Sequence, residues 1–285
     1  MYKQILLPVE EDTESSELLH HASEIAHWAE AEVQILYVAN TNRDSVTLTD
    51  RNVVDALLER GEDIVEEAGA LLDSLGVEYS TDVVQGVPAE TIVDYAERYE
   101  FDLVAMPTHG REGLSRYLLG SVTEKVVRLS SVPVLTARDG DKVEFPYESL
   151  LVPTDGSDSA RRAADHAVAF ADALDATVHA LSATDNSVLA NVEEALDGRA
   201  EKETAKEAVG SVVEMAEGDG VENVETHIQA GVPDEVILGY IDEHDIGAVV
   251  MGTTGRSGVD RVLLGSVAEK TVRSAPVPVI TVGGE

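Results

Sequence analysis

The sequence predicts an α/β protein with two tandem domains, each an open parallel five-stranded sheet with helices on both faces. Along the chain, short apolar runs alternate with helical patterns, an order typical of a parallel sheet. The pattern also occurs twice at a constant spacing. Pro8 matches Pro153 and Gly86 matches Gly231, both 145 residues apart (153 − 8 = 231 − 86 = 145). A constant spacing at distant points indicates two copies of one domain.

The elements of the first copy follow from its local patterns. The apolar run 5–8 predicts a buried strand, and helical spacing begins at 14. Pro88 suits the first turn of a helix, where no backbone N–H is needed. The expected elements are strand 5–8, helix 14–30, strand 33–38, helix 52–75, strand 77–84, helix 88–98, strand 103–106, helix 122–129 and strand 132–136. The second copy repeats this order, and right-handed crossovers leave few topologies.

A short polar segment separates the two copies. Residues 138–147 contain Gly140 and Pro146 among charged residues, which is typical of a linker. We therefore expect domain 1 at 1–137, a linker at 138–147 and domain 2 at 148–285.

The charge of the chain is strongly negative. It has 55 acidic and 20 basic residues, a net charge of −35, although 44% of its residues are hydrophobic. Such a surface repels nucleic acids and anionic membranes, so we expect neither as a partner. We interpret the acidity as adaptation to a high-salt, halophilic cytosol.

Other classes of protein are disfavoured by what the chain lacks. It has no Cys, which excludes disulfides and thiolate metal sites. The first apolar run is too short for a signal peptide, acids follow it, and no apolar stretch is long enough to span a membrane. We expect a soluble cytoplasmic protein. His20, Glu24 and His27 share one helix face, but the histidines are two turns apart, so we expect no metal site made by the protein alone.

A glycine frame in the second copy carries the most chemistry. Gly252-Thr253-Thr254-Gly255 is followed, after nine residues, by Gly265-Ser266. Glycines let backbone N–H groups approach an anion and permit positive φ. Ser266 with Glu269, like Ser121 with Glu124 in the first copy, matches a capping box, so a helix N-terminus should begin there. Such a terminus is a ready phosphate site.

A second ligand-like feature follows the first strand of the second copy. Asp155 can accept hydrogen bonds from ribose hydroxyls. If the strand order is 3-2-1-4-5, the Asp155 loop and the glycine loop are neighbours where the strand order reverses. Ligands bind at that point in open α/β sheets.

These motifs together resemble the universal stress protein family. The resemblance rests on residues 151–157, 251–255, 265–270 and 277–280, and it extends over both copies. It implies a tandem member, similar to haloarchaeal ones, with an adenine-nucleotide alpha-hydrolase-like fold. The family is linked to stress survival and has no settled reaction. Members with the full glycine frame bind ATP or a related adenine nucleotide, for which Mg²⁺ is a candidate companion.

The resemblance also implies site residues and partners. The nucleotide-binding residues carried over to the second copy are Pro153, Thr154, Asp155, Ala183, Met251, Gly252, Thr254, Gly255, Gly265, Ser266 and Val267. Family members usually pair through the last strand of the domain. The two copies are therefore expected to pair with each other in that way, and a homodimer of the whole chain stays open.

The first copy departs from the frame at two positions. Pro107 replaces Gly252 and lacks an N–H, and Glu10 replaces Asp155 with a longer side chain. A weaker first-domain site would use Glu10, Val38, Met106, His109, Gly110, Gly120, Ser121 and Val122. We expect the second site to bind nucleotide and the first to bind weakly or not at all.

The residues leave other functions open. Residues 154–159 superficially resemble the pyrophosphate loop of ATP-pyrophosphatase enzymes, but Asp155 would place a carboxylate against the pyrophosphate. No nucleophile–base pair stands out. A nucleotide-independent interaction or holdase module is the other alternative. The preferred interpretation is a regulatory nucleotide-binding protein, with ATP hydrolysis slow at most.

The charge leads to a first prediction. Repulsion among the acids is screened within about 10 Å at roughly 0.1 M salt and over longer distances when salt is removed. Raising KCl should therefore raise the thermal unfolding temperature of the chain. A melting temperature that does not respond to KCl would contradict the halophilic interpretation.

Overall fold

The computed structural model describes residues 1–10, 17–40, 51–108, 119–138, 140–184, 192–255 and 263–284, except for the side chains of 51–57 and 192–199. The chain divides into two compact units, residues 2–140 and 141–285. Each unit is described by itself.

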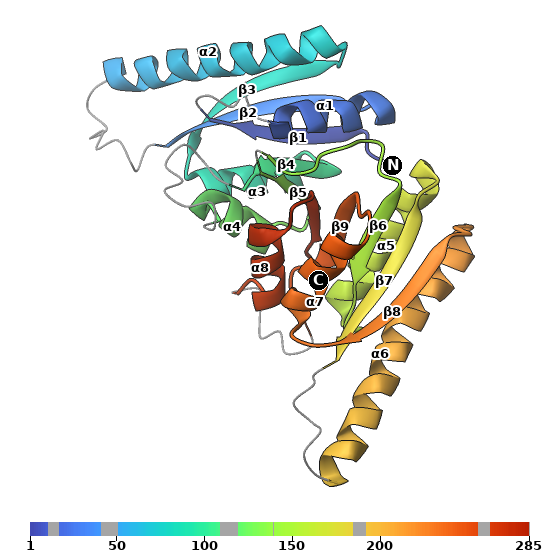
Figure 1. Cartoon of the computed structure of the whole chain (residues 1–285). Helices are drawn as coiled ribbons and strands as arrows, with labels where there is room; N and C mark the ends of the chain where they lie inside the picture. Colours follow the sequence, from blue (N-terminus) through green and yellow to red (C-terminus); the bar gives the residue numbers. More distant parts are fainter. Residues whose placement is uncertain are drawn as a thin grey trace. The chain divides into compact units, whose positions relative to one another are not determined.

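The first unit is a parallel sheet with strand order β3-β2-β1-β4-β5. Its elements are β1 (Gln4–Val9), α1 (Glu17–Ala29), β2 (Glu32–Asn40), α2 (Arg51–Leu75), β3 (Tyr79–Gly86), α3 (Pro88–Arg98), β4 (Leu103–Pro107), α4 (Ser121–Leu129) and β5 (Val134–Ala137) (Figure 1).

The second unit repeats this arrangement, with strand order β8-β7-β6-β9-β10. Its elements are β6 (Ser149–Pro153), α5 (Asp158–Leu174), β7 (Thr177–Thr184), α6 (Val192–Asp219), β8 (Val224–Ala230), α7 (Pro233–Glu243), β9 (Ala248–Gly252), α8 (Ser266–Ser274) and β10 (Val279–Val282). Numbered within each unit, both orders are 3-2-1-4-5, so the expected fold class and strand order are confirmed.

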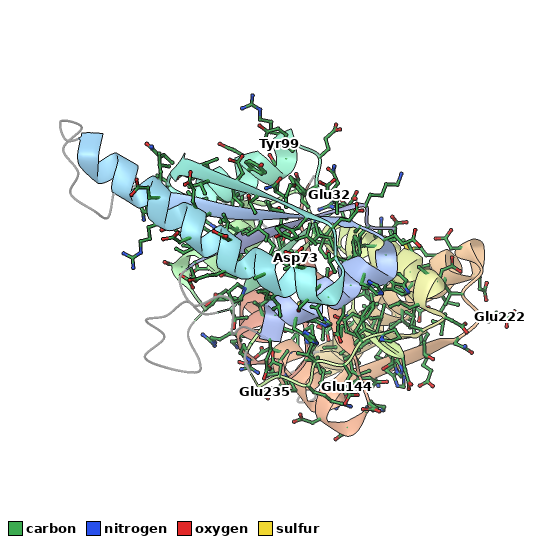
Figure 2. All side chains as sticks on the ribbon, turned by 90° about the horizontal axis from the view of Figure 1, so that it is seen from above. Glu32, Asp73, Tyr99, Glu144, Glu222 and Glu235 are labelled. Carbon is green, nitrogen blue, oxygen red and sulfur yellow. The ribbon has the colours of Figure 1, made fainter. Side chains whose placement is uncertain are left out.

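Helices cover both faces of each sheet. In the first unit α1 packs with α2 and α3 packs with α4; in the second unit the pairs are α5 with α6 and α7 with α8 (Figure 1). The central strands are therefore buried on both sides, as in β1, where Ile5, Leu6 and Leu7 are almost fully buried. Acidic side chains such as Glu32 and Glu144 lie on the exposed surface (Figure 2).

Two strands begin later than expected because a turn occupies their first residues. The N–H of Val77 donates to Leu72 O in the C-terminal turn of α2, so β3 begins at Tyr79 rather than 77. The N–H of Val132 donates to the Ser130 hydroxyl at 3.1 Å, so β5 begins at Val134 rather than 132. Residues 14–16 of the expected first helix lie outside the described residues.

Among the described residues, no helix is both long and apolar enough to cross a membrane.

A histidine lies at matching positions of the two units. His21 in α1 is fully buried, and His166 in α5, 145 residues later (166 − 21 = 145), is half-buried. Burial lowers the pKa of each to about 4, and for His21 the charge of His20 adds to the effect. Both imidazoles are therefore neutral in the folded protein at neutral pH.

These two histidines should make stability depend on pH. Below about pH 6.5 the unfolded chain takes up protons on them, whereas the folded chain does so only near pH 4. In this window the unfolded state binds more protons, so the free energy of unfolding rises with pH. The contribution is complete above about pH 6.5 and is lost as the pH falls towards 4. Each histidine accounts for roughly 3 kcal/mol, at about 1.4 kcal/mol per pKa unit.

Chemical denaturation between pH 4 and 7 at fixed high salt measures this dependence. The double variant His21→Leu, His166→Leu should have a flatter slope than the wild type. His27→Gln is the matched control, because His27 is an exposed residue of the same helix and should leave the slope unchanged. Equal slopes in the wild type and the double variant would contradict the assignment.

Candidate functional site

The candidate site lies where three neighbouring strands of the second unit end. β7, β6 and β9 are adjacent and parallel, so their carboxyl ends lie at one edge of the sheet. Pro153 ends β6, and the N–H of Thr154 donates to Leu181 O on β7 at 2.8 Å. Ala183 lies near the end of β7 and is half-buried, whereas Met251 on β9 is buried.

The Asp155 carboxylate, in the loop after β6, lies between the residues that begin α5 and the glycine loop. One oxygen, Oδ1, accepts the N–H of Ser157 at 2.9 Å. Ser157 in turn caps α5 by accepting the N–H of Ala160 at 3.2 Å. The other oxygen, Oδ2, faces the glycine loop, because a Cβ added at Gly255 would lie 3.0 Å from it. The structure therefore brings together the Asp155 loop and the glycine loop.

Gly252 is required by packing rather than by an unusual backbone conformation. None of Gly252, Gly255 and Gly265 has positive φ, which corrects the conformational reason expected from the sequence. Instead, a Cβ at Gly252 would meet the first turn of α5, at 2.5 Å from Ser159 Oγ and 2.7 Å from Ser159 C. The absence of a side chain lets α5 approach β9.

Ser159 is a site residue that the sequence reasoning missed. Its hydroxyl lies beside Gly252 and accepts the N–H of Thr254 at 3.4 Å. It therefore links the start of α5 to the glycine loop. The only sequence signal is its place as the second residue of the helix that follows Asp155.

Helix α8 begins differently from the expected capping box. Its N-cap is Gly265, with φ −60 and ψ 138 and no side-chain cap, and Ser266 is already its first helical residue. The reason is a backbone hydrogen bond from Gly265 N–H to Thr253 O at 2.8 Å, which closes the loop at Gly265. Ser266 is consequently exposed rather than capping.

The start of α8 presents backbone donors. The first intrahelical bond runs from Glu269 N–H to Gly265 O at 2.9 Å. For the N–H groups of Ser266, Val267 and Ala268, no acceptor is found among the described residues. Such groups at a helix N-terminus, together with the helix dipole, favour an anion.

The first unit builds the same helix start with an equivalent backbone bond, and its differences lie at Pro107 and Thr123. Gly120 caps α4 with the same φ and ψ as Gly265, and its N–H donates to Thr108 O at 2.7 Å. Ser121 begins α4 and is not its cap, which again corrects the expected capping box. Pro107 ends β4, and its carbonyl accepts the Thr123 hydroxyl at 2.7 Å.

The remaining residues of the weaker site are placed as follows. Glu10 directly follows β1 and is exposed, Val38 on β2 is half-buried, Met106 on β4 is buried, and Val122 is the second residue of α4. His109 and Gly110 lie outside the described residues.

The role of Gly252 leads to a prediction. In Gly252→Ala the new methyl group would overlap backbone atoms of Ser159, so α5 must shift. We expect the free energy of unfolding to fall by about 1–3 kcal/mol, as for other overpacked sites. The matched control is Gly210→Ala in α6, where no atom lies within 4 Å, and it should gain roughly 0.5–1 kcal/mol. A Gly252→Ala protein as stable as the wild type would show that the packing is not tight.

Comparison with known proteins agrees with this architecture. A universal stress protein of Methanocaldococcus jannaschii is 37% identical over 151 residues, which is 51% of this chain and 85% of that protein. The crystal structure of a universal stress protein from Archaeoglobus fulgidus is 25% identical, covers 98% of both chains and has a TM-score of 0.75. A functionally unknown protein from Pseudomonas aeruginosa, at 21% identity and a TM-score of 0.66, shares the fold. The model of the universal stress protein family matches residues 1–138 and again 146–283, so the chain belongs to this family as a tandem member.

Proposed function

We propose that this chain is a regulatory stress-response protein that binds ATP or a related adenine nucleotide at the second-unit site. The observation that carries the proposal is that Asp155 Oδ2 lies beside Gly255. Gly255 belongs to the short loop that begins at Thr253. Thr253 is also bonded to the start of α8. A ribose acceptor and a phosphate-binding helix start are therefore anchored to one strand end.

Each part of a nucleotide has a matching group at this edge. The N–H groups of Ser266 and Val267 would bind phosphate oxygens. The Asp155 carboxylate would accept the ribose hydroxyls, and Met251 with Ala183 would contact the base. These are the residues that the family resemblance predicts, and Pro153, Thr154, Gly252 and Thr254 complete the same strand ends.

The charge of the chain limits how this site can work. A net charge of −35 repels a triphosphate at long range. Backbone donors and a helix dipole attract the phosphates at short range. Salt screens the long-range repulsion from the acidic residues within about 10 Å at roughly 0.1 M. We therefore expect binding to need high salt or Mg²⁺, which lowers the charge of the nucleotide.

The first-unit site should be weaker. Pro107 offers no N–H, and Glu10 stands in place of Asp155. The loss of one hydrogen bond to a charged group costs about 1.5–3 kcal/mol, or roughly ten- to a hundredfold in affinity. The domain boundary within 138–147, the pairing of the domains through their last strands and a homodimer stay proposals that rest on the family.

Titration calorimetry with ATP and Mg²⁺ in high KCl tests the proposal. Asp155→Asn keeps an oxygen for the Ser157 N–H, so the loop should persist, but it removes the carboxylate charge. We expect it to weaken ATP binding roughly ten- to a hundredfold. Glu10→Gln, at the matching position of the first unit, is the control and should not change the affinity.

Two outcomes would reject this assignment. If Asp155→Asn binds ATP as tightly as the wild type, the ribose role of Asp155 is wrong. If wild-type protein binds no nucleotide, the chain is better described as a nucleotide-independent interaction module. Pyrophosphate release with an added amine substrate would instead support the pyrophosphatase-type enzyme.

A further inference from the structure

A second cluster of functional groups lies on β7 and β8, away from the nucleotide edge. In this parallel pair His179 lies opposite Glu225, and Leu181 lies opposite His227. Residues two apart on a strand share a face, so His179, Glu225 and His227 project to the same side. One ligand atom from each of the three lies within 4.8 Å of the others.

The distances between these atoms suit a small cation. Glu225 Oε2 lies 3.7 Å from His179 Nδ1 and 3.4 Å from His227 Nε2. A tetrahedral zinc site with bonds of about 2.1 Å places its ligand atoms about 3.4 Å apart. Two of the three edges thus already have nearly the required length. The set of two imidazoles and one carboxylate is that of known catalytic zinc sites.

One proposed ligand atom has a hydrogen-bond partner in the structure and another has none. His179 is only 9% exposed, and its Nδ1 is hydrogen-bonded to the Tyr240 hydroxyl of α7 at 2.9 Å, a bond that must be released before this nitrogen can bind an ion. The Tyr240 ring stacks on His244, with centroids 3.8 Å apart, and so forms a wall beside the cluster. The Nε2 of His227 is buried and has no hydrogen-bond partner among the described residues. A buried nitrogen without a partner costs stability, and a metal ion would satisfy it.

The first unit shows what these positions do without such ligands. The residues 145 positions earlier are Gln34 (179 − 145), Ser80 (225 − 145) and Asp82 (227 − 145). There Ser80 donates to Gln34 Oε1 at 2.9 Å, and Asp82 accepts the Tyr95 hydroxyl at 3.1 Å. The position of His244 is taken by Tyr99, which is 50% exposed (Figure 2). In the first unit the polar side chains at these positions are hydrogen-bonded, whereas in the second unit the imidazoles of His179 and His227 lie beside the Glu225 carboxylate.

We propose that His179 Nδ1, Glu225 Oε2 and His227 Nε2 bind a divalent transition-metal ion of the Zn²⁺ class. Nitrogen ligands favour such ions over Mg²⁺ and Ca²⁺, which prefer oxygen. Three protein ligands leave a fourth position for water or an exogenous group. The ion would fasten the edge strand β8 to β7. The site is separate from the proposed nucleotide site, because four residues of strand, roughly 13 Å, separate His179 from Ala183.

Titration of the whole chain with Co²⁺ tests the proposal. The chain should carry no histidine tag, and high KCl with excess Mg²⁺ should be present to occupy diffuse carboxylate sites. Co²⁺ is a spectroscopic substitute for Zn²⁺, since a tetrahedral site gives strong visible absorption and a hydrated or carboxylate-bound ion gives weak absorption. We expect one ion per chain with strong absorption, displaced by Zn²⁺, and a higher thermal unfolding temperature with Zn²⁺.

The duplication supplies the test variant. The triple variant His179→Gln, Glu225→Ser, His227→Asp installs the residues that the first unit uses in the same fold. It should lose more than the roughly 10–100-fold in affinity that follows loss of an outer-shell partner. The single variant His227→Gln, on the edge strand, provides the same test if the triple variant does not fold. His20→Gln removes a surface histidine and should change nothing.

Two results would overturn the proposal. One is weak absorption with no response beyond that of Mg²⁺, which would make the cluster a packed group of aromatic and polar side chains. The other is strong absorption that persists in the His179, Glu225 and His227 variants. ATP binding is measured separately, so failure of this site leaves the proposed nucleotide function untouched.

Discussion

Burial of both sheet faces is the constraint on which the rest of each unit depends. Helices cover both sides of the central strands, so these strands are buried and apolar after their first residues, as β1 and β6 are. Polar functional side chains are therefore disfavoured in the middle of the sheet and lie mainly at the ends of the strands. This explains why Asp155, Thr254 and Ser266 gather at the carboxyl edge. The exceptions are the buried His179 of β7 and the edge strand β8, most of whose residues are exposed and which carries Glu225 and His227.

The two units share the frame and differ in the chemistry placed on it. Gly120 and Gly265 start their helices with the same dihedral angles. His21, which is buried, and His166, which is half-buried, lie at the same position of their domains. Features shared in this way serve the fold. The differences, above all Pro107 against Gly252 and Gln34 against His179, fall at the carboxyl edge and on the β7–β8 pair. Such differences indicate where the copies have taken on separate roles.

Much of the fold could be predicted from the sequence because its signals are local or repeated. Periodicity located the elements, and the recurrence of Pro8 at Pro153 revealed the duplication. The strand order followed from the family and from the crossover rule. The sequence also indicated which loops would meet, since it placed Asp155 and Gly255 after strands that become neighbours.

The parts that were missed depend on contacts between distant segments. The role of Gly252 depends on how closely α5 approaches β9. The start of α8 depends on a bond between Gly265 and Thr253 across a loop. His179 is separated from Glu225 and His227 by the whole of α6, and only the register of β7 against β8 brings them together. Sequence reasoning looked for a metal site within a single helix, at His20, Glu24 and His27, where spacing can be read directly.

The most direct test of the central claim is the nucleotide content of the protein itself. The chain would be purified at high salt and denatured, and the released small molecules would be quantified by mass spectrometry. The account predicts an adenine nucleotide at about one per chain, held by the second unit. Nearly two per chain would contradict the weakness assigned to the Pro107 site. No nucleotide, together with no ATP binding on titration with Mg²⁺, would contradict the proposed function.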